Sequence, residues 1–135
     1  MTKEDKERLL KDLGGRLPYG VKILDIPANV VGKLSLISTT DTVQYETADD
    51  TGVQTLYNIK PYLLPLSSMT EEQKREYNML LTDVPTYEYE GGDIVTVFET
   101  YDNWMSIDYL DANHFDYRYL IEDGLAIDAT GLGIY

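Results

Sequence analysis

The fold of this chain is constrained most by four short β-type segments that follow one another between residues 21 and 59. Each is rich in Val, Ile, Leu, Thr or Tyr, and Pro, Asn, Gly or Asp residues separate it from the next, as in strands joined by tight turns. The segments are Val21 to Ile26, Val30 to Ile37, Thr42 to Thr47 and Val53 to Ile59. Strands this short and this closely spaced predict an antiparallel meander or a small barrel.

Capping signals predict helices on either side of these strands. Thr2 can accept a backbone hydrogen bond at the start of a helix that Gly14 and Gly15 would stop. Thr70 and Gln73 have the spacing of a capping box, in which each side chain bonds the other residue's backbone N–H. The predicted helices are Lys3 to Leu13, a second from Thr70 to near Leu81, and a third that Asp102 caps and that Asn113 and His114 interrupt.

The segment between the strands and the second helix contains Pro61 and Pro65. Proline has no backbone N–H, and it keeps the residue before it out of helical conformation. We therefore expect an ordered crossing loop from Ile59 to Ser68, held in place by its apolar side chains.

The remaining segments complete the predicted architecture. Period-two alternation around a Gly-Gly pair predicts a hairpin over residues 86–98, and Leu125 to Ala129 predicts a last strand after a turn that Gly124 ends. A chain of 135 residues is the size of one domain. We expect a single domain, residues 1–135, of the α+β class, with a small antiparallel sheet or partial barrel covered by two or three short helices.

Acidic residues outnumber basic ones by 24 to 11, which gives a formal net charge of −13. The excess lies late in the chain: 10 basic residues face 12 acidic ones up to Thr82, whereas from Asp83 onward 12 acidic residues face Arg118 alone. Such a field repels nucleic-acid phosphates, which argues against direct DNA or RNA binding. Two interpretations stay open: a solvated surface, which is the commoner use of such charge, and mimicry of nucleic acid toward a basic partner.

The composition also bears on the compartment. No cysteine occurs, and the opening sequence MTKEDKERLL is too charged for a secretory signal. No apolar run approaches the roughly 18 residues of a membrane span. The absence of cysteine excludes disulfides, thiolate chemistry and cysteine metal sites. Together with the missing signal and membrane span, it leads us to expect a cytoplasmic protein that does not bind membranes.

Motifs that look like metal or catalytic sites are better explained by local structure. His114 with Asp116 lacks the further ligands of a zinc site, so we expect the imidazole to bond backbone at a helix end. Asp50, Thr51 and Gly52 spell the aspartic-protease triplet, but a polar stretch precedes them, which favours a hairpin turn. Phosphate-binding loops and nucleophile elbows do not occur. We expect no catalytic residue, metal or cofactor.

Three blocks of the sequence match one pattern and keep its order. They are Arg16 to Lys22 (RLPYGVK), Ile59 to Glu72 without Leu64 (IKPYLxPLSSMTEE), and Asn113 to Ile127 without Tyr119, Glu122 and Asp123 (NHFDYRxLIxxGLAI). In these blocks the chain resembles a family of short proteins encoded in the genomes of gut Bacteroidales and in their phages and prophages. The resemblance implies a gene neighbourhood, and it brings no reaction, ligand or catalytic residue with it.

Tyrosine is abundant, with 12 residues against two Phe and one Trp. Its ring and hydroxyl suit surfaces that recognise a partner, and an arginine among tyrosines can hold a carboxylate or a phosphate. The candidate ligand- or partner-binding residues are Arg16, Tyr19, Tyr62, His114, Tyr117 and Arg118. As surface residues, the two arginines would tolerate alanine with little loss of stability. For Arg118 the alternative is an internal ion pair with Asp116, Glu122 or Asp123.

These features favour a non-enzymatic binding protein of phage or prophage origin that modulates host physiology. Counter-defence would act by sequestering a small nucleotide-type signal or by blocking a host protein. The alternatives are an acidic decoy that inhibits a host nucleic-acid-binding protein, and a small hydrolase of unrecognised type, since so many acidic residues guarantee close carboxylate pairs. We also expect a homodimer that covers apolar, tyrosine-rich surface through the near-neutral first 82 residues.

Overall fold

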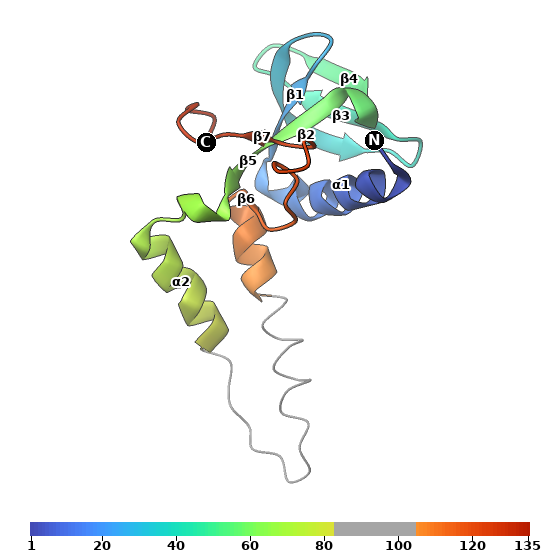
Figure 1. Ribbon diagram of the computed structural model, residues 1–135. Helices are drawn as coiled ribbons and strands as arrows, with labels where there is room; N and C mark the ends of the chain where they lie inside the picture. Colours follow the sequence, from blue (N-terminus) through green and yellow to red (C-terminus); the bar gives the residue numbers. More distant parts are fainter. Residues whose placement is uncertain (83–104) are drawn as a thin grey trace.

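The computed structural model describes residues 1–82 and 105–135, and it has the α+β arrangement that the sequence predicts (Figure 1). The described strands form one open, mostly antiparallel sheet in the order β4-β3-β2-β1-β5-β6, and β7 also pairs with β5. The strands are β1 (Lys22–Asp25), β2 (Val30–Ile37), β3 (Thr42–Glu46), β4 (Thr51–Thr55), β5 (Ile59–Pro65), β6 (Phe115–Asp116) and β7 (Ile127–Asp128). The helices are α1 (Lys3–Arg16), α2 (Glu71–Thr82) and residues 105–112, with short 3-10 turns η1 (Leu17–Tyr19), η2 (Leu56–Asn58) and η3 (Leu66–Ser68).

Helix α1 begins where the sequence predicts. The backbone N–H of Asp5 donates to Thr2 Oγ1 at 3.1 Å, and the N–H of Thr2 donates to Asp5 Oδ2 at 3.1 Å. These two bonds complete a capping box at the first turn. Leu9 and Leu13 on the inner side of the helix are fully buried against the sheet.

The predicted end of this helix at Leu13 is wrong, because α1 continues through both glycines to Arg16. Gly15 lets the helix approach Asp111 closely, since a Cβ at this position would lie 2.8 Å from Asp111 Oδ2. The last turn is also held by Arg16, whose Nε donates to Asp12 Oδ2 at 2.8 Å. Tertiary contacts at the helix end therefore outweigh the low helix propensity of glycine.

Strands β2, β3 and β4 form the predicted meander, and Tyr45 at its centre explains two of its glycines. Gly32 of β2 and Gly52 of β4 lie on either side of Tyr45, and a Cβ at either glycine would overlap the tyrosine ring. The hydroxyl of Tyr45 donates to the buried carboxylate of Asp25 at 2.6 Å. The ring thus occupies the space that the two glycines leave.

Asp50 of the aspartic-protease-type triplet ends the turn between β3 and β4, and Thr51 and Gly52 begin β4, which confirms the predicted hairpin. The N–H of Thr47 donates to the carbonyl of Asp50 at 2.8 Å and closes the turn. Strand β4 is an edge of the sheet. The N–H of Thr51 donates to Asp50 Oδ1 at 2.8 Å and that of Thr55 donates to Gln54 Oε1 at 2.9 Å. Side chains thus satisfy two edge N–H groups, which disfavours pairing with a further strand.

The predicted crossing loop is wrong over most of its length, because Ile59–Pro65 forms strand β5 between β1 and the C-terminal strands. The N–H of Ile26 donates to the carbonyl of Asn58 at 2.9 Å, and hydrogen-bonded pairs alternate along antiparallel strands. By this alternation, Pro61 falls at a position where pairing with β1 needs no N–H. Pro65 is the last residue of the strand. Each proline therefore occupies a strand position that tolerates it.

Helix α2 confirms the second predicted helix. The N–H of Gln73 donates to Thr70 Oγ1 at 3.1 Å, and the N–H of Thr70 donates to Gln73 Oε1 at 2.9 Å, which is the predicted capping box. Figure 1 shows α2 beside the helix formed by residues 105–112. The hydroxyl of Tyr109 joins the two, donating to Glu76 Oε2 at 2.8 Å.

The C-terminal segment follows the predicted order of turns. The third helix ends at residue 112, before His114, which has a left-handed backbone with φ of 65°. Gly124 has φ of 74°, and β7 lies within the predicted last strand and runs parallel to β5. The predicted hairpin over residues 86–98 and the cap at Asp102 lie outside the described residues.

The main hydrophobic core lies between α1, the sheet and the segment before β7. Its fully buried members are Leu9, Leu13, Val21, Ile23, Leu34, Val43, Leu56, Ile59, Leu63 and Leu120. Among the described residues, no helix combines the length and the apolar character that crossing a membrane requires.

Candidate functional site

Arg16, at the end of α1, is completely buried. Its Nε donates to Asp12 Oδ2 at 2.8 Å and its Nη2 donates to Asp12 Oδ1 at 3.1 Å. Nη2 also donates to the backbone carbonyl of Phe115 in β6. Arg16 thereby joins α1 to the C-terminal part of the chain. We now expect alanine at this position to destabilise the protein, in place of the tolerance expected for a surface residue.

Arg118 approaches the same carboxylate from the loop after β6. Its Nη1 donates to Asp12 Oδ1 at 3.0 Å and to Tyr117 Oη at 2.8 Å. The guanidinium carbons of Arg118 and Arg16 lie 4.6 Å and 5.3 Å from the centre of the Tyr117 ring. An internal ion pair of Arg118 therefore exists, but its partner is Asp12 in α1 and not one of the three carboxylates in its own segment.

Tyr117 connects this cluster to a second buried carboxylate. Its hydroxyl donates to Asp111 Oδ1 at 2.7 Å, and Arg16 Nε lies 3.9 Å from the same oxygen. Burial raises the pKa of Asp111, while the hydrogen bond from Tyr117 and the charge of Arg16 act in the opposite direction. Burial, followed by the hydrogen bond to Asp111, raises the pKa of Tyr117. Tyr117 is therefore a neutral phenol that donates its proton within the cluster.

His114 belongs to a separate junction near the end of the chain. Its ring stacks on Tyr135, with centroids 3.7 Å apart and planes 9° from parallel. The hydroxyl of Tyr135 donates to the carbonyl of Tyr62 at 2.7 Å and accepts the N–H of Lys22 at 2.9 Å. Burial, with Arg16 and Lys22 adding to it, lowers the pKa of His114 to about 4, so the imidazole is neutral at pH 7. Its buried Nδ1 makes no hydrogen bond to a described residue.

The structure thus separates the six candidate residues into three groups. Arg16, Tyr117 and Arg118 meet around Asp12, and His114 and Tyr62 share the Tyr135 junction. Tyr19 in η1 donates its hydroxyl to Asp108 of the third helix. Of the six, Arg118 lines a surface hollow.

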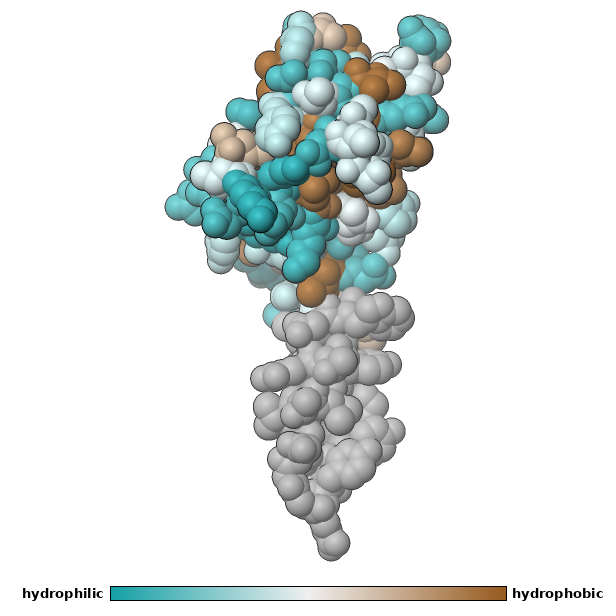
Figure 2. Space-filling model, turned by 90° about the vertical axis from the view of Figure 1, so that its right-hand side faces the viewer, coloured by the Kyte–Doolittle hydropathy of each residue, from teal (hydrophilic) through white to brown (hydrophobic). Residues whose placement is uncertain are grey.

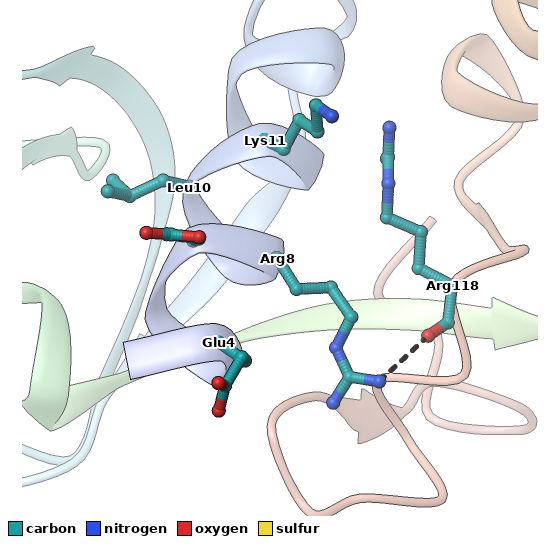
Figure 3. A pocket seen from close by; sticks show the side chains of 6 residues that line it. Glu4, Arg8, Leu10, Lys11 and Arg118 are labelled. Carbon is teal, nitrogen blue, oxygen red and sulfur yellow. Dashed lines mark hydrogen bonds between the residues drawn. The ribbon is translucent and has the colours of Figure 1, made fainter. Parts of the chain in front are cut away.

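This hollow, of about 660 Å³, lies between α1 and Arg118 (Figure 3). It is lined by Glu4, Glu7, Arg8, Leu10, Lys11 and Arg118. Figure 3 shows the side chains of Arg8 and Lys11 extending from α1 toward the segment that carries Arg118. Positions 4, 8 and 11 share a helix face because they are one and two turns apart. The helix therefore forms one wall and Arg118 the other.

The lining of the hollow is more basic than the chain as a whole. Three cations and two carboxylates line it, a net charge of +1 (3 − 2), in a chain of net charge −13. Arg8 Nη2 lies 2.6 Å from Asp123 Oδ2, and Arg8 Nη1 donates to the carbonyl of Arg118 at 3.5 Å, so Arg8 fixes the loop to α1. Arg118 shares the Asp12 carboxylate with Arg16. Within the described ranges, no carboxylate lies within 4.0 Å of the Lys11 ammonium.

Arg8 and Lys11 are absent from the residues that the sequence singles out. The sequence could have indicated both residues, because a helix that starts at Lys3 places Arg8 and Lys11 on one face. The sequence does not show that Arg118 faces them. In residues 1–82 and 105–135, no group of three His, Cys, Asp or Glu side chains could hold a metal ion. Comparison with protein-family models, with curated proteins and with solved structures finds no match to this chain.

Proposed function

We propose that this protein is a non-enzymatic binding protein that captures a small phosphate- or carboxylate-bearing ligand in the hollow between α1 and Arg118. The observation that carries the proposal is the convergence of Arg8, Lys11 and Arg118 on one hollow of an acidic chain. Arginine and lysine donors of this kind form charge-assisted hydrogen bonds with oxyanions. The ligand chemistry is therefore that of a small anion.

Arg118 is held ready for such a ligand. Its two hydrogen bonds, to Asp12 and Tyr117, both use Nη1, and its side chain remains 22% exposed. The other guanidinium N–H groups make no bond to a described residue, so they can donate to a ligand. Because Asp12 and Tyr117 already fix the side chain, binding costs little conformational entropy.

Long-range attraction does not supply the affinity, since the chain as a whole repels anions. A ligand must therefore contact the three cations directly, and it must be small enough to avoid the carboxylates of Glu4 and Glu7 at the same hollow. A compact phosphate group meets this condition better than an extended polyanion. In this proposal the ligand is a small nucleotide-type signal.

The biological setting of the proposal rests on the sequence blocks. Their resemblance to proteins of gut Bacteroidales and their phages supports a phage or prophage origin. Capture of a nucleotide-type signal in the host cytoplasm would then modulate host physiology as counter-defence. Blocking of a host protein at the same surface is the second form of this proposal.

The acidic-decoy alternative has less support from the described residues. Of the six acidic residues in 105–135, Asp111 and Asp116 are buried and Asp123 pairs with Arg8. Asp108 accepts from Tyr19, and Asp128 accepts the N–H of Thr130. A decoy needs an array of exposed carboxylates, whereas most of these carboxylates serve the protein's own structure.

A homodimer remains part of the proposal, with the outer face of β2 to β4 as its surface. Val31, Leu36 and Val53 are exposed there, and register places Leu36, Gln44 and Val53 in one row. Figure 2 shows hydrophobic patches between hydrophilic ones on one side of the described part. Sedimentation at micromolar concentration tests this: a species of twice 15.4 kDa supports the dimer, and a 15.4 kDa species refutes it.

Calorimetric titration with inorganic phosphate and with AMP tests the proposed function. We expect binding that Lys11→Ala weakens by about tenfold, the cost of one charge-assisted bond. Lys3→Ala is the matched control, because Lys3 lies on the same helix outside the lining of the hollow. Binding that both variants leave unchanged, or no binding of either anion at millimolar concentration, would overturn the proposal.

A further inference from the structure

A second hollow, of about 310 Å³, lies between η3 and the loop that follows β6. It is lined by Pro65, Leu66, Ser67, Asp116, Tyr119, Ile121 and Glu122. None of these residues lines the hollow beside α1. What this second site binds is therefore a question separate from the function proposed above.

Tyr119 is presented at this hollow in an unusual way. Its side chain is 62% exposed, and its backbone is left-handed with φ of 59°. This conformation is rare for a bulky side chain and costs about 1 kcal/mol or more. An exposed ring gains too little from packing to offset that cost. Strain of this kind persists where the surrounding structure imposes it, and it concentrates at binding sites.

The hydrogen bonds of the surrounding loop impose the left-handed backbone of Tyr119. Asp116, which is buried, accepts the N–H groups of Leu120 and Ile121 on its two carboxylate oxygens, each at 3.0 Å. The N–H of Asp123 donates to the carbonyl of Tyr119 at 3.3 Å, and the N–H of Leu125 donates to the carbonyl of Leu120 at 2.8 Å. The backbone of Tyr119 is thus fixed between bonded neighbours, and this fixes the position from which its ring extends.

The residues that line this second hollow indicate which kind of side chain it can bind. The ring of Tyr119 offers an aromatic face, and Leu66, Pro65 and Ile121 offer apolar contact. The carboxylate of Glu122 is exposed, and it forms no ion pair with any residue in the described ranges. An aromatic face, an apolar wall and a carboxylate together fit a side chain with an aliphatic stem and a cationic head.

We propose that this hollow binds an arginine side chain of a basic partner protein, stacked on Tyr119 and paired with Glu122. Arginine fits better than lysine because its planar guanidinium stacks on aromatic rings and bonds carboxylates in the same pose. The net charge of −13 favours the approach of a basic partner. A nucleic-acid strand is disfavoured, since its phosphates would meet Glu122.

NMR titration of the isotope-labelled full chain with the peptide acetyl-Gly-Arg-Gly-amide tests the proposal. We expect saturable shifts at Tyr119, Ile121 and Glu122, and no such shifts with the same peptide carrying norleucine in place of arginine. Tyr119→Ala and Glu122→Gln should each weaken binding at least about threefold, the range of an exposed cation–π contact or ion pair. Glu72→Gln, on α2 and outside the hollow, is the matched control.

A second variant separates binding from folding. Tyr119→Gly relieves the left-handed strain, so its melting temperature should equal or exceed that of the wild type, while peptide binding weakens as in Tyr119→Ala. A fall in melting temperature together with unchanged binding would show that Tyr119 is a structural residue and would overturn the proposal. Equal binding of the norleucine peptide, or shifts at these residues with a single-stranded oligonucleotide instead of the arginine peptide, would overturn it as well. Failure here leaves phosphate binding at Lys11 intact, and the reverse also holds.

Discussion

Replacing Arg16 with alanine should destabilise the protein more than any other single change among the six residues that the sequence singled out for binding. The substitution leaves the fully buried Asp12 carboxylate without two of its three hydrogen bonds, and it leaves the carbonyl of Phe115 without a donor. Removing one member of a buried ion pair costs about 3–5 kcal/mol. Arg118 still donates to Asp12, which keeps the expected loss within this range. For a chain of this size the melting temperature should fall by roughly 10–18 °C.

Urea denaturation followed by circular dichroism measures this loss as a change in the free energy of unfolding. Arg16→Lys should fall between the wild type and Arg16→Ala, because lysine keeps the charge but loses the two-pronged geometry. Arg75→Ala, at an exposed position of α2, is the control and should change stability by less than about 0.5 kcal/mol. If Arg16→Ala costs no more than Arg75→Ala, the buried pair does not stabilise the fold as described.

The remaining predictions concern pH and two glycines. The pKa of His114 is lowered from 6.5 to about 4 in the folded protein. Between these two pH values the imidazole is protonated in the unfolded chain but not in the folded one, so the free energy of unfolding should fall as the pH drops from 6.5 to 4. Asparagine tolerates the left-handed backbone, so His114→Asn should fold, and its urea midpoint should change less than that of the wild type between pH 6.5 and 4. An equal pH dependence of the midpoint in the two proteins would contradict this reasoning. Gly52→Ala should cost about 1–3 kcal/mol because its methyl group overlaps the buried Tyr45 ring. Gly14→Ala, in open space within α1, should instead stabilise by about 0.5–1 kcal/mol, and thermal melts that rank the two variants the other way would refute this account.

Capping and turn residues predicted those helix and strand ends that depend on neighbouring residues in the sequence. The capping residues Thr2 and Thr70 start their helices as predicted, and the turn residues around β2 give it its bounds. Strand β5 was missed because Pro61 argues against a strand in isolation, and its tolerated position depends on pairing with β1. The extension of α1 was missed for a similar reason, since Gly15 packs against the distant Asp111.

The sequence predicted only part of the candidate site. The sequence indicated Arg118 and left its ion pair open, but the partner, Asp12, lies in another element. The pairing of Asp12 with Arg16 was within reach, because residues four apart on a helix are neighbours. No pattern in the sequence shows that Lys11 faces the loop after β6, since that contact depends on how the C-terminal segment docks on α1.

The most direct test of the central claim is to map where inorganic phosphate binds, using NMR amide and side-chain shifts of the full chain at constant pH and ionic strength. We expect saturable shifts confined to the hollow, at Arg8, Lys11 and Arg118, with the Arg118 side-chain N–H signals moving most because they donate to the anion. Shifts at Lys3 should stay small. Saturable shifts centred elsewhere, or uniform shifts that grow linearly with phosphate concentration, would contradict an anion site at this hollow.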